Sequence, residues 1–323
     1  MSGLFGLPAG SIGLGLAAVG RPGYITVGHS TDLGPAPTVE RLERRCHDLL
    51  DAAWAAGVRY IDVARSYGLA EQFLASWLDR RGLPDGALVV ASKWGYRYTA
   101  DWQIGAAVHE LKDHSLATLR RQLAESRQLL GDRLCLYQVH SATLESGVLD
   151  DRAVLAELVR LSDVGLRIGL SISGPRQAEV LRRALAARMD GRNPFTTVQA
   201  TWNVLEPSVG AALAEVHAAG WGVIVKEALA NGRLAQPGPG RVSAVLRAIA
   251  RRRGTTVDAV ALAAARANPW ADIVLSGAAT VAQLVSNLAA ASVELQPDDL
   301  AALSGLAEPP ERYWAERSAL AWN

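Results

Sequence analysis

The sequence contains little of several residue types, and each shortage excludes a class of protein. Its 323 residues include two cysteines, Cys46 and Cys135, which are too few for a disulfide framework. No apolar run is long enough to span a bilayer. The N-terminus lacks the basic and apolar regions of a signal peptide. We therefore expect a protein of the cytoplasm.

Neither sign of charge is in excess. The chain has 33 basic and 32 acidic side chains, for a formal net charge of +1. This balance gives no reason to expect nucleic acid or an anionic membrane as a partner. The arginine-rich stretches 41–45 and 251–253 lack interleaved aromatic residues, and we interpret them as solvated helix faces. The six histidines show no spacing typical of metal ligands, so no metal site is expected.

Lysine is the scarcest charged residue. The chain has only Lys93, Lys112 and Lys226, so that arginine supplies the other 30 basic side chains. Lys93 and Lys226 stand at the ends of predicted strands. Because lysine fits a tighter space than arginine and its charge can be tuned, we expect these two to have specific tasks. Chance retention at three positions is the alternative.

Strand-like apolar runs alternate with amphipathic helical stretches along the chain. The predicted strands are 11–16, 60–62, 88–93, 134–139, 167–171, 197–201, 221–226 and 272–276. The predicted helices are 39–56, 69–80, 116–130, 149–164, 175–187, 207–219, 242–253, 257–267 and 281–290. Eight such units predict an α/β protein of one domain, a (β/α)8 TIM barrel. A doubly wound open sheet is the alternative, but no Gly-x-Gly-x-x-Gly opens a βαβ unit.

Three segments fall outside this repeat, namely 20–37, 94–115 and the tail from about 307. Long loops at the C-terminal ends of barrel strands usually form the binding pocket. We therefore expect these segments to bind substrate. The predicted walls of the pocket are Trp94, Tyr96, Trp102, Trp202 and Trp314. Anchoring of the loops to the barrel is the alternative role for these rings.

Four polar residues stand where consecutive predicted strands end. Asp62 and Tyr67 follow the second strand, Lys93 ends the third and His140 ends the fourth. In a parallel barrel these positions converge on one pocket. A phenol whose pKa is lowered by a lysine can give a proton to a carbonyl, with Asp62 holding the lysine and His140 orienting the carbonyl. Such a set supplies no hydride, so a nicotinamide cofactor is implied.

The segment Ile61-Asp-Val-Ala-Arg-Ser-Tyr-Gly68 resembles the Asp-Thr-Ala-x-x-Tyr-Gly signature of the aldo-keto reductase superfamily. Lys93 and His140 match the remaining two catalytic positions, and the resemblance extends from residue 11 to about residue 290. It implies an NAD(P)H-dependent oxidoreductase with Tyr67 as proton donor. The enzyme would reduce an aldehyde or ketone, or act in reverse on an alcohol or sugar-like substrate.

The resemblance also implies an extended cofactor across the barrel mouth, without a Rossmann domain. The positions expected to bind it are Gly15, Ser171, Gln199, Lys226, Glu227, Leu229, Asn231, Gly232, Arg233, Gly277, Thr280, Gln283 and Asn287. NADPH is the expected cofactor. NADH is the alternative, because the usual cation for the 2′-phosphate is not evident, and Arg233 is the candidate to replace it.

Three positions depart from the family pattern. Ile172 stands where an asparagine is usual, Lys226 where an aromatic ring often stacks on the nicotinamide, and Glu227 where many members have serine. These changes leave two other functions open. One is a nucleotide-binding regulatory or redox-sensing barrel with little turnover, and the other is an isomerase or lyase that uses the same four catalytic residues.

Overall fold

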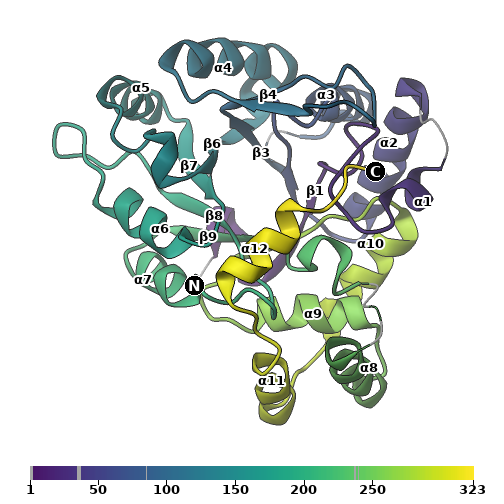
Figure 1. Cartoon of the computed structure of the whole chain (residues 1–323). Coiled ribbons are helices and arrows are strands. Elements are labelled where there is room, and N and C mark those ends of the chain that lie inside the picture. Colours follow the sequence, from purple (N-terminus) through teal and green to yellow (C-terminus); the bar gives the residue numbers. More distant parts are fainter. Residues whose placement is uncertain (1–2, 35–37, 85, 236–237, 239) are drawn as a thin grey trace.

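Among the described residues, eight parallel strands close into a barrel in the computed structural model of the chain (Figure 1). The structure describes residues 3–34, 38–84, 86–235, 238 and 240–323. In spatial order the barrel strands are β1 (Ser11–Gly15), β10 (Ile273–Ser276), β9 (Gly222–Lys226), β8 (Thr197–Thr201), β7 (Arg167–Ile172), β6 (Leu134–Ala142), β3 (Val89–Trp94) and β2 (Tyr60–Asp62). The predicted TIM barrel is therefore confirmed.

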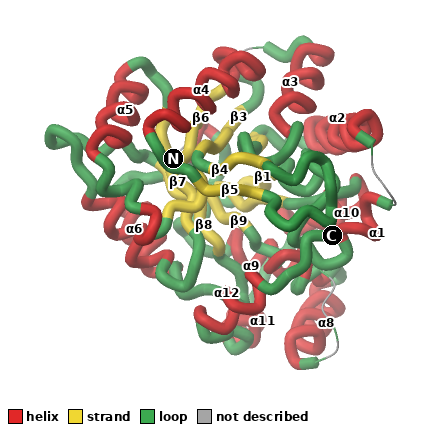
Figure 2. Tube along the Cα trace, turned by 45° about the horizontal axis from the view of Figure 1, so that its top comes forward, coloured by secondary structure: helices red, strands yellow, loops and turns green. Residues whose placement is uncertain are grey.

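Helices surround the strands, as Figure 2 shows in red around yellow. Those of the barrel repeat are α2 (Val39–Ala55), α3 (Ala70–Arg81), α4 (Leu116–Leu130), α5 (Arg152–Asp163), α6 (Gln177–Ala186), α7 (Gly210–Ala218), α8 (Arg241–Arg253), α9 (Val257–Arg266) and α10 (Val281–Leu288). Their bounds lie within three residues of the predicted ones. Side-chain caps explain several starts: Thr38 accepts the backbone N–H of Arg41, and Ser115 accepts that of Thr118.

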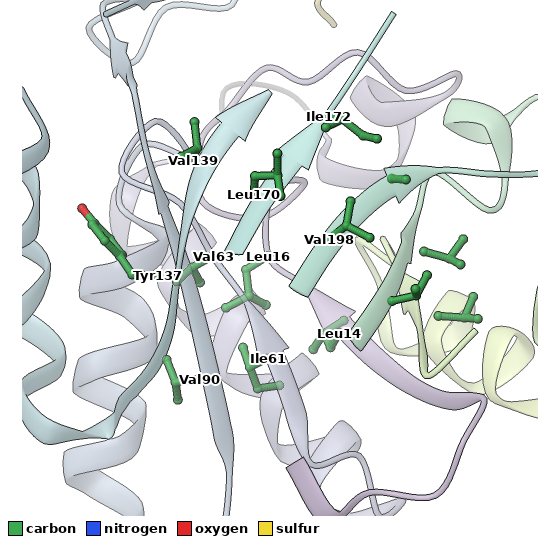
Figure 3. Close-up of a cluster of buried hydrophobic side chains, with 14 of the residues drawn as sticks. Leu14, Leu16, Ile61, Val63, Val90, Tyr137, Val139, Leu170, Ile172 and Val198 are labelled. Carbon is green, nitrogen blue, oxygen red and sulfur yellow. The ribbon is translucent and has the colours of Figure 1, made fainter. Parts of the chain in front are cut away.

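Two apolar layers hold the barrel together. The outer layer lies between strands and helices, and Figure 3 shows part of it, with Leu14, Val139 and Ile172 among its side chains. The inner layer fills the N-terminal end of the barrel around Tyr60 and Leu136. Leu4 of the short helix η1 (Leu4–Gly6) packs there against Gly222, where a β-carbon would lie 2.4 Å from the leucine side chain. The barrel is thus filled at one end, and its other end is free to hold a site.

The segments outside the repeat contain regular structure that the sequence pattern does not indicate. Segment 94–115 folds into a hairpin of β4 (Tyr96–Tyr98) and β5 (Glu110–Lys112), and α1 (His29–Leu33) follows β1. Residues 35–37 of the first predicted loop lie outside the described residues. Helix α11 (Pro297–Ser304) precedes the tail, and α12 (Pro310–Ser318) lies within it.

The tail crosses the barrel mouth and ends on the loop that follows β1 (Figure 1). The backbone of Asn323 pairs with that of Tyr24, and its side chain accepts the N–H of Ser30 at 3.0 Å. Segments nearly 300 residues apart in sequence thereby cover the same end of the barrel. Within the described chain, no helix is both long and apolar enough to cross a bilayer.

Candidate active site

A cavity of about 710 Å³ lies at the C-terminal ends of the barrel strands. Its lining includes the ends of β1, β2, β8, β9 and β10, the start of α10 and the chain's tail. Tyr67 lies at one end of it and Asn287 at the other. The volume falls within the range of about 300–1,000 Å³ that is usual for ligand and cofactor sites.

Three of the four predicted catalytic residues are joined by hydrogen bonds at the first end. The Lys93 ammonium donates to the Asp62 carboxylate and, at 3.1 Å each, to the Val63 carbonyl and the Tyr67 hydroxyl. Lys93 and Asp62 are almost completely buried, and Gln199 gives Asp62 a further hydrogen bond at 2.8 Å. The lysine is therefore fixed, charged and aimed at the phenol oxygen.

The Tyr67 phenol differs from the expectation in its acidity. Burial, followed by the charge of Asp62, raises its pKa well above the usual value, although Lys93 was expected to lower it. The physical reason is that burial disfavours the charged phenolate, and the Asp62 carboxylate adds to this effect. Tyr67 therefore keeps its proton at neutral pH, as a proton donor must.

His140 completes the group from β6. Its ring lies edge-on to that of Tyr67, with 5.5 Å between ring centroids, and its Nδ1 lies 3.4 Å from the Ser66 hydroxyl. Burial, together with the charges of Lys93 and Lys226, lowers the pKa of His140 well below the usual value. The imidazole is therefore neutral, and its Nε2 is left for a ligand in the cavity, which His140 lines.

Close backbone contact positions the turn that carries Tyr67. The N–H of Leu69 donates to the carbonyl of Gly20 at 2.7 Å, which joins this turn to the loop after β1. A β-carbon on Gly20 would lie 2.2 Å from the Tyr67 carbonyl, and one on Gly68 would lie 2.4 Å from the Gly20 carbonyl. The glycine that follows Tyr67 in the motif is thus required by packing.

The same end of the cavity contains a buried ion pair that the sequence analysis missed. Arg21 donates at 2.6 Å to Glu110 of β5 and at 2.7 Å to the carbonyl of Ser66. Its guanidinium lies 4.7 Å from the centroid of the Trp322 ring and 5.5 Å from that of Tyr67. No local motif reveals this cluster, because its members come from four distant segments.

Lys226 and Glu227 form a second cluster, with helix α12. Glu227 accepts hydrogen bonds from Arg317 at 2.5 and 2.9 Å and from the Thr201 hydroxyl at 3.1 Å. Lys226 donates to Thr201 at 2.9 Å and to Ser173 at 3.2 Å, and lies 3.7 Å from Glu227. The departure at Glu227 is thus explained by its partner in the tail, since the Glu227–Arg317 pair ties α12 to the barrel mouth.

This pair predicts a pH-dependent contribution to stability. Burial opposes ionisation of the Glu227 carboxyl, but the charges of Arg317 and Lys226 outweigh it and lower the pKa to about 2. A depressed pKa stabilises the fold above the unfolded value near ~4.3, and this contribution is lost as pH falls through the folded value. We expect Glu227→Gln to cost about 3 kcal/mol in the free energy of unfolding at pH 7.

Urea unfolding of wild type and Glu227→Gln between pH 7 and pH 2.5 measures this difference. It should shrink steadily below about pH 4.5, following the protonation of Glu227. Glu215→Gln is the matched control, because its pair with Arg182 is exposed. A constant difference across the whole range would show that Glu227 does not stabilise the fold through its charge.

Most residues predicted to bind the cofactor line the cavity. They are Gly15, Gln199, Lys226, Glu227, Leu229, Asn231, Gly232, Gly277, Gln283 and Asn287. Ser171, Thr280 and Arg233 lie outside its lining. Ser171 accepts the backbone N–H of Ser141 at 2.8 Å, and Thr280 caps α10. Arg233 pairs with two carboxylates of the tail segment, those of Glu308 and Glu316.

The end of the cavity near α10 has a different character. The Asp32 carboxylate accepts the Gln283 amide at 2.8 Å, and the Arg45 guanidinium donates to the Asp32 carbonyl. Arg45 is a cation near this end that the sequence analysis did not single out.

Ile172, the third departure from the family pattern, is fully buried in the outer apolar layer (Figure 3).

Of the five predicted pocket walls, Tyr96 lines the cavity. The other four pack elsewhere. Trp94 is buried against His114, Trp202 against Trp270 and Trp314 against Tyr313, while Trp102 borders a separate depression. These four rings lie outside the cavity lining. Tyr24 and Trp322 line the cavity instead, and the latter stacks on His109 with 4.1 Å between ring centroids.

Comparison with known proteins places this geometry in a family. The sequence profile of the Aldo/keto reductase family matches residues 12–308. Protein tas of Escherichia coli is 27% identical, with 82% of this chain and 89% of that protein covered. An aryl-alcohol dehydrogenase [NADP(+)] of Phanerodontia chrysosporium is 28% identical over 48% of this chain. The match spans 41% of that dehydrogenase and 52% of a similar aldo-keto reductase of Emericella nidulans.

Solved structures agree in fold. An aldo-keto reductase from Bacillus halodurans, in its holo form, superposes with a TM-score of 0.67 at 20% identity, covering 93% of this chain and 92% of that one. An aldo/keto reductase from Klebsiella pneumoniae in complex with NADP gives a TM-score of 0.66 at 22% identity with the same coverage. The family profile extends over most of the chain. The chain therefore belongs to the aldo/keto reductase family.

Proposed function

We propose that this protein reduces aldehydes or ketones to alcohols, with NADPH as hydride donor and Tyr67 as proton donor. The observation that carries the proposal is the contact between Lys93 and the protonated phenol of Tyr67, with His140 beside it in the cavity. The aryl-alcohol dehydrogenase relative and the Klebsiella structure both name NADP, which supports the choice of cofactor. The expected cytoplasmic location stays a prediction.

The cavity fits an extended dinucleotide. Gly232 and Gly277 line it without side chains, and Gly277 has no atom within 4 Å of the place where a β-carbon would be. The buried Oδ1 of Asn231 has no partner among the described residues and is free to accept a hydrogen bond from a ligand. The start of α10 at the far end suits a phosphate group. Gln199 would lie at the nicotinamide end, next to Asp62.

The residues at the catalytic end perform the proton transfer. As negative charge develops on the carbonyl oxygen, the Tyr67 hydroxyl gives it a proton, and Lys93 stabilises the phenolate that remains. Asp62 keeps the ammonium in place. The neutral imidazole of His140 donates a hydrogen bond to the same oxygen. A bound nicotinamide cofactor supplies the hydride to the carbonyl carbon. Because the phenol holds its proton at neutral pH, Tyr67 is in the protonation state that carbonyl reduction requires.

The test is cofactor consumption coupled to alcohol formation. The protein is mixed with NADPH and a panel of uncharged carbonyl compounds, including benzaldehyde, cyclohexanone and glyceraldehyde. We expect one alcohol for each NADPH oxidised, with the aromatic aldehyde fastest, because Tyr24, Tyr96 and Trp322 line the cavity. Tight NADPH binding without consumption on any member would favour the regulatory alternative. Product formation without net consumption would favour an isomerase or lyase.

A further inference from the structure

The lysines of this chain gather around a single cavity. Lys93 donates a hydrogen bond to Tyr67, which lines the cavity, and Lys112 and Lys226 line the cavity themselves. The remaining 30 basic side chains of the chain are arginines. The sequence analysis singled out two lysines and missed Lys112, because it lies in a hairpin and not at the end of a barrel strand. All three are thus placed to act at the barrel mouth.

Hydrogen bonds link Lys226 to Lys112 through two serines, one near the end of β6 and one after β7. Lys226 donates to the Ser173 hydroxyl at 3.2 Å, and Ser173 donates to the Ser141 hydroxyl at 3.2 Å. The Ser141 carbonyl accepts from Lys112 at 3.0 Å. We call these four residues the lysine–serine row. All four line the cavity, so the row presents two ammonium groups and two hydroxyls to a ligand.

The backbone of β6 is distorted where it enters this row. Its register shifts between Val139 and Ala142, and Ser141 has φ of +51°, a left-handed conformation that is strained for a residue with a side chain. In a regular strand His140 and Ser141 would face opposite sides. The bulge lets both line the cavity, and the Ser171 hydroxyl, which accepts the N–H of Ser141, stabilises it. The strain therefore places a hydroxyl directly beside the catalytic imidazole.

The charges at this end of the cavity do not balance. The cations are Arg21, Lys93, Lys112, Lys226 and Arg317, and the carboxylates are Asp62, Glu110 and Glu227. Each carboxylate is the partner of another cation: Asp62 of Lys93, Glu110 of Arg21 and Glu227 of Arg317. Five cations against three carboxylates leave an excess of two positive charges, one on Lys112 and one from Lys226 and Arg317, which share Glu227. An excess of this kind, with one ammonium largely buried and the other exposed at the rim, attracts an anion.

Both lysines have unused hydrogen-bond donors. An ammonium carries three N–H groups. Lys226 uses two of them on Ser173 and Thr201, and Lys112 uses one on Ser141, as far as the described residues go. Burial lowers the pKa of Lys226 to about 8, so its charge is present at neutral pH. Lys112 can therefore donate to an anionic ligand without losing its hydrogen bond to Ser141, whereas Lys226 would share its third N–H between the ligand and Glu227, which lies 3.7 Å away.

We propose that the lysine–serine row is an anion subsite and that the protein's substrates are carbonyl compounds that carry a carboxylate group. This inference rests on the proposed carbonyl reduction and names its substrate class. The carboxylate lies along Ser141 and Ser173, and the carbonyl group lies against His140 and Tyr67. The aromatic rings of the cavity contact the part of the substrate between them.

The phosphates of the cofactor are the competing occupant of the row. Ser141, Ser173 and Lys112 come from β6, the segment after β7 and the hairpin, whereas the segments expected to hold the phosphates follow β9 and β10. Lys226 lies at the boundary, and Lys112 lies farthest along the row from it. If replacement of Lys112 lowers kcat/KM for acid substrates and leaves cofactor affinity unchanged, the row binds the substrate carboxylate and not a cofactor phosphate.

The test compares 4-carboxybenzaldehyde with its methyl ester, which has the same reacting group and no charge. In wild type we expect kcat/KM to be at least tenfold higher for the acid. Lys226→Met should lower the acid-to-ester ratio by tenfold or more, since this lysine is largely buried, and Lys112→Met by two- to fivefold, since it is exposed at the rim. Arg97→Met is the matched control, because it removes a positive charge from the same hairpin outside the cavity lining.

The outcomes separate this inference from the proposed function. Turnover of the ester with an acid-to-ester ratio near one, or equal ratios in wild type and both lysine variants, would overturn the subsite and leave the reductase assignment intact. If neither aldehyde reacts, the proposed function fails. Calorimetric titration of the protein with benzoate and benzamide then tests the subsite alone. Benzoate should bind more tightly than benzamide, with the preference lost in Lys226→Met and reduced in Lys112→Met, and an unchanged preference in both variants would overturn it.

Discussion

Replacement of Tyr67 by phenylalanine is expected to lower kcat/KM for carbonyl reduction by about 10³-fold, because the reaction then lacks its proton donor. The hydroxyl that is removed makes its contact with Lys93, and the ring itself stays packed in the cavity. The affinity for NADPH should change by less than about twofold, since no charge is altered. Steady-state kinetics with benzaldehyde and fluorescence titration with NADPH measure the two quantities.

Tyr60→Phe is the matched control for this variant. Tyr60 is a buried tyrosine whose hydroxyl has no hydrogen bond among the described residues, and it lies in the inner apolar layer outside the cavity lining. It should retain wild-type kinetics. Retention of more than a tenth of the activity in Tyr67→Phe would show that another group protonates the carbonyl oxygen.

Replacement of Lys93 by methionine is expected to damage both stability and activity. It leaves the Asp62 carboxylate buried with the Gln199 amide and without a cation. Loss of one partner of a buried pair costs about 3–5 kcal/mol in the free energy of unfolding. Activity should fall by at least about 10²-fold, because the phenolate formed in the reaction loses its stabilising charge. Urea unfolding and kinetics with benzaldehyde measure the two effects.

The double variant Asp62→Asn with Lys93→Met separates the two effects. With both charges removed, no unpaired ion is buried, and most of the lost stability should return. The activity should not return, because the ammonium beside Tyr67 is still missing. Recovery of both quantities together would mean that Lys93 acts only as a structural partner of Asp62. Recovery of neither would mean that the pair is needed for the packing of the barrel mouth.

The sequence was sufficient to predict the barrel and the convergence of Asp62, Tyr67, Lys93 and His140, because both depend on local pattern. Each barrel strand is a short apolar run, and Asp62, Lys93 and His140 stand at the ends of such runs. Parallel strands of a barrel must bring those ends together. The positions of the strands were therefore enough to predict that Lys93 would reach Tyr67.

Contacts between distant segments could not be predicted in this way. Arg317 and Glu227 are 90 residues apart, and nothing near either residue indicates the other. The hairpin strands of three residues each are too short to show a pattern of alternation. For this reason the sequence analysis missed Lys112, and it selected tryptophans that pack against the barrel instead of Trp322.

The direction of the Tyr67 pKa shift also could not be predicted from the sequence. We expected Lys93 to lower the pKa of the phenol because only the effect of the ammonium was taken into account. In the folded site, burial and the carboxylate of Asp62 both raise this pKa. The sum of these effects has the opposite sign. A sequence pattern can indicate which charged residues will lie near an ionisable group. The direction of that group's pKa shift also depends on burial and on distances in the folded protein.

The most direct measurement of the central claim is the transfer of isotope from reduced cofactor to product. The protein is incubated with benzaldehyde and NADPH that carries deuterium at C4 of the nicotinamide, prepared separately for each face of the ring. We predict that one of the two preparations gives benzyl alcohol with one deuterium on its carbinol carbon, and that Tyr67→Phe reduces its rate of formation by about 10³-fold. Benzyl alcohol without deuterium from both preparations, or no alcohol at all, would contradict hydride transfer at this site.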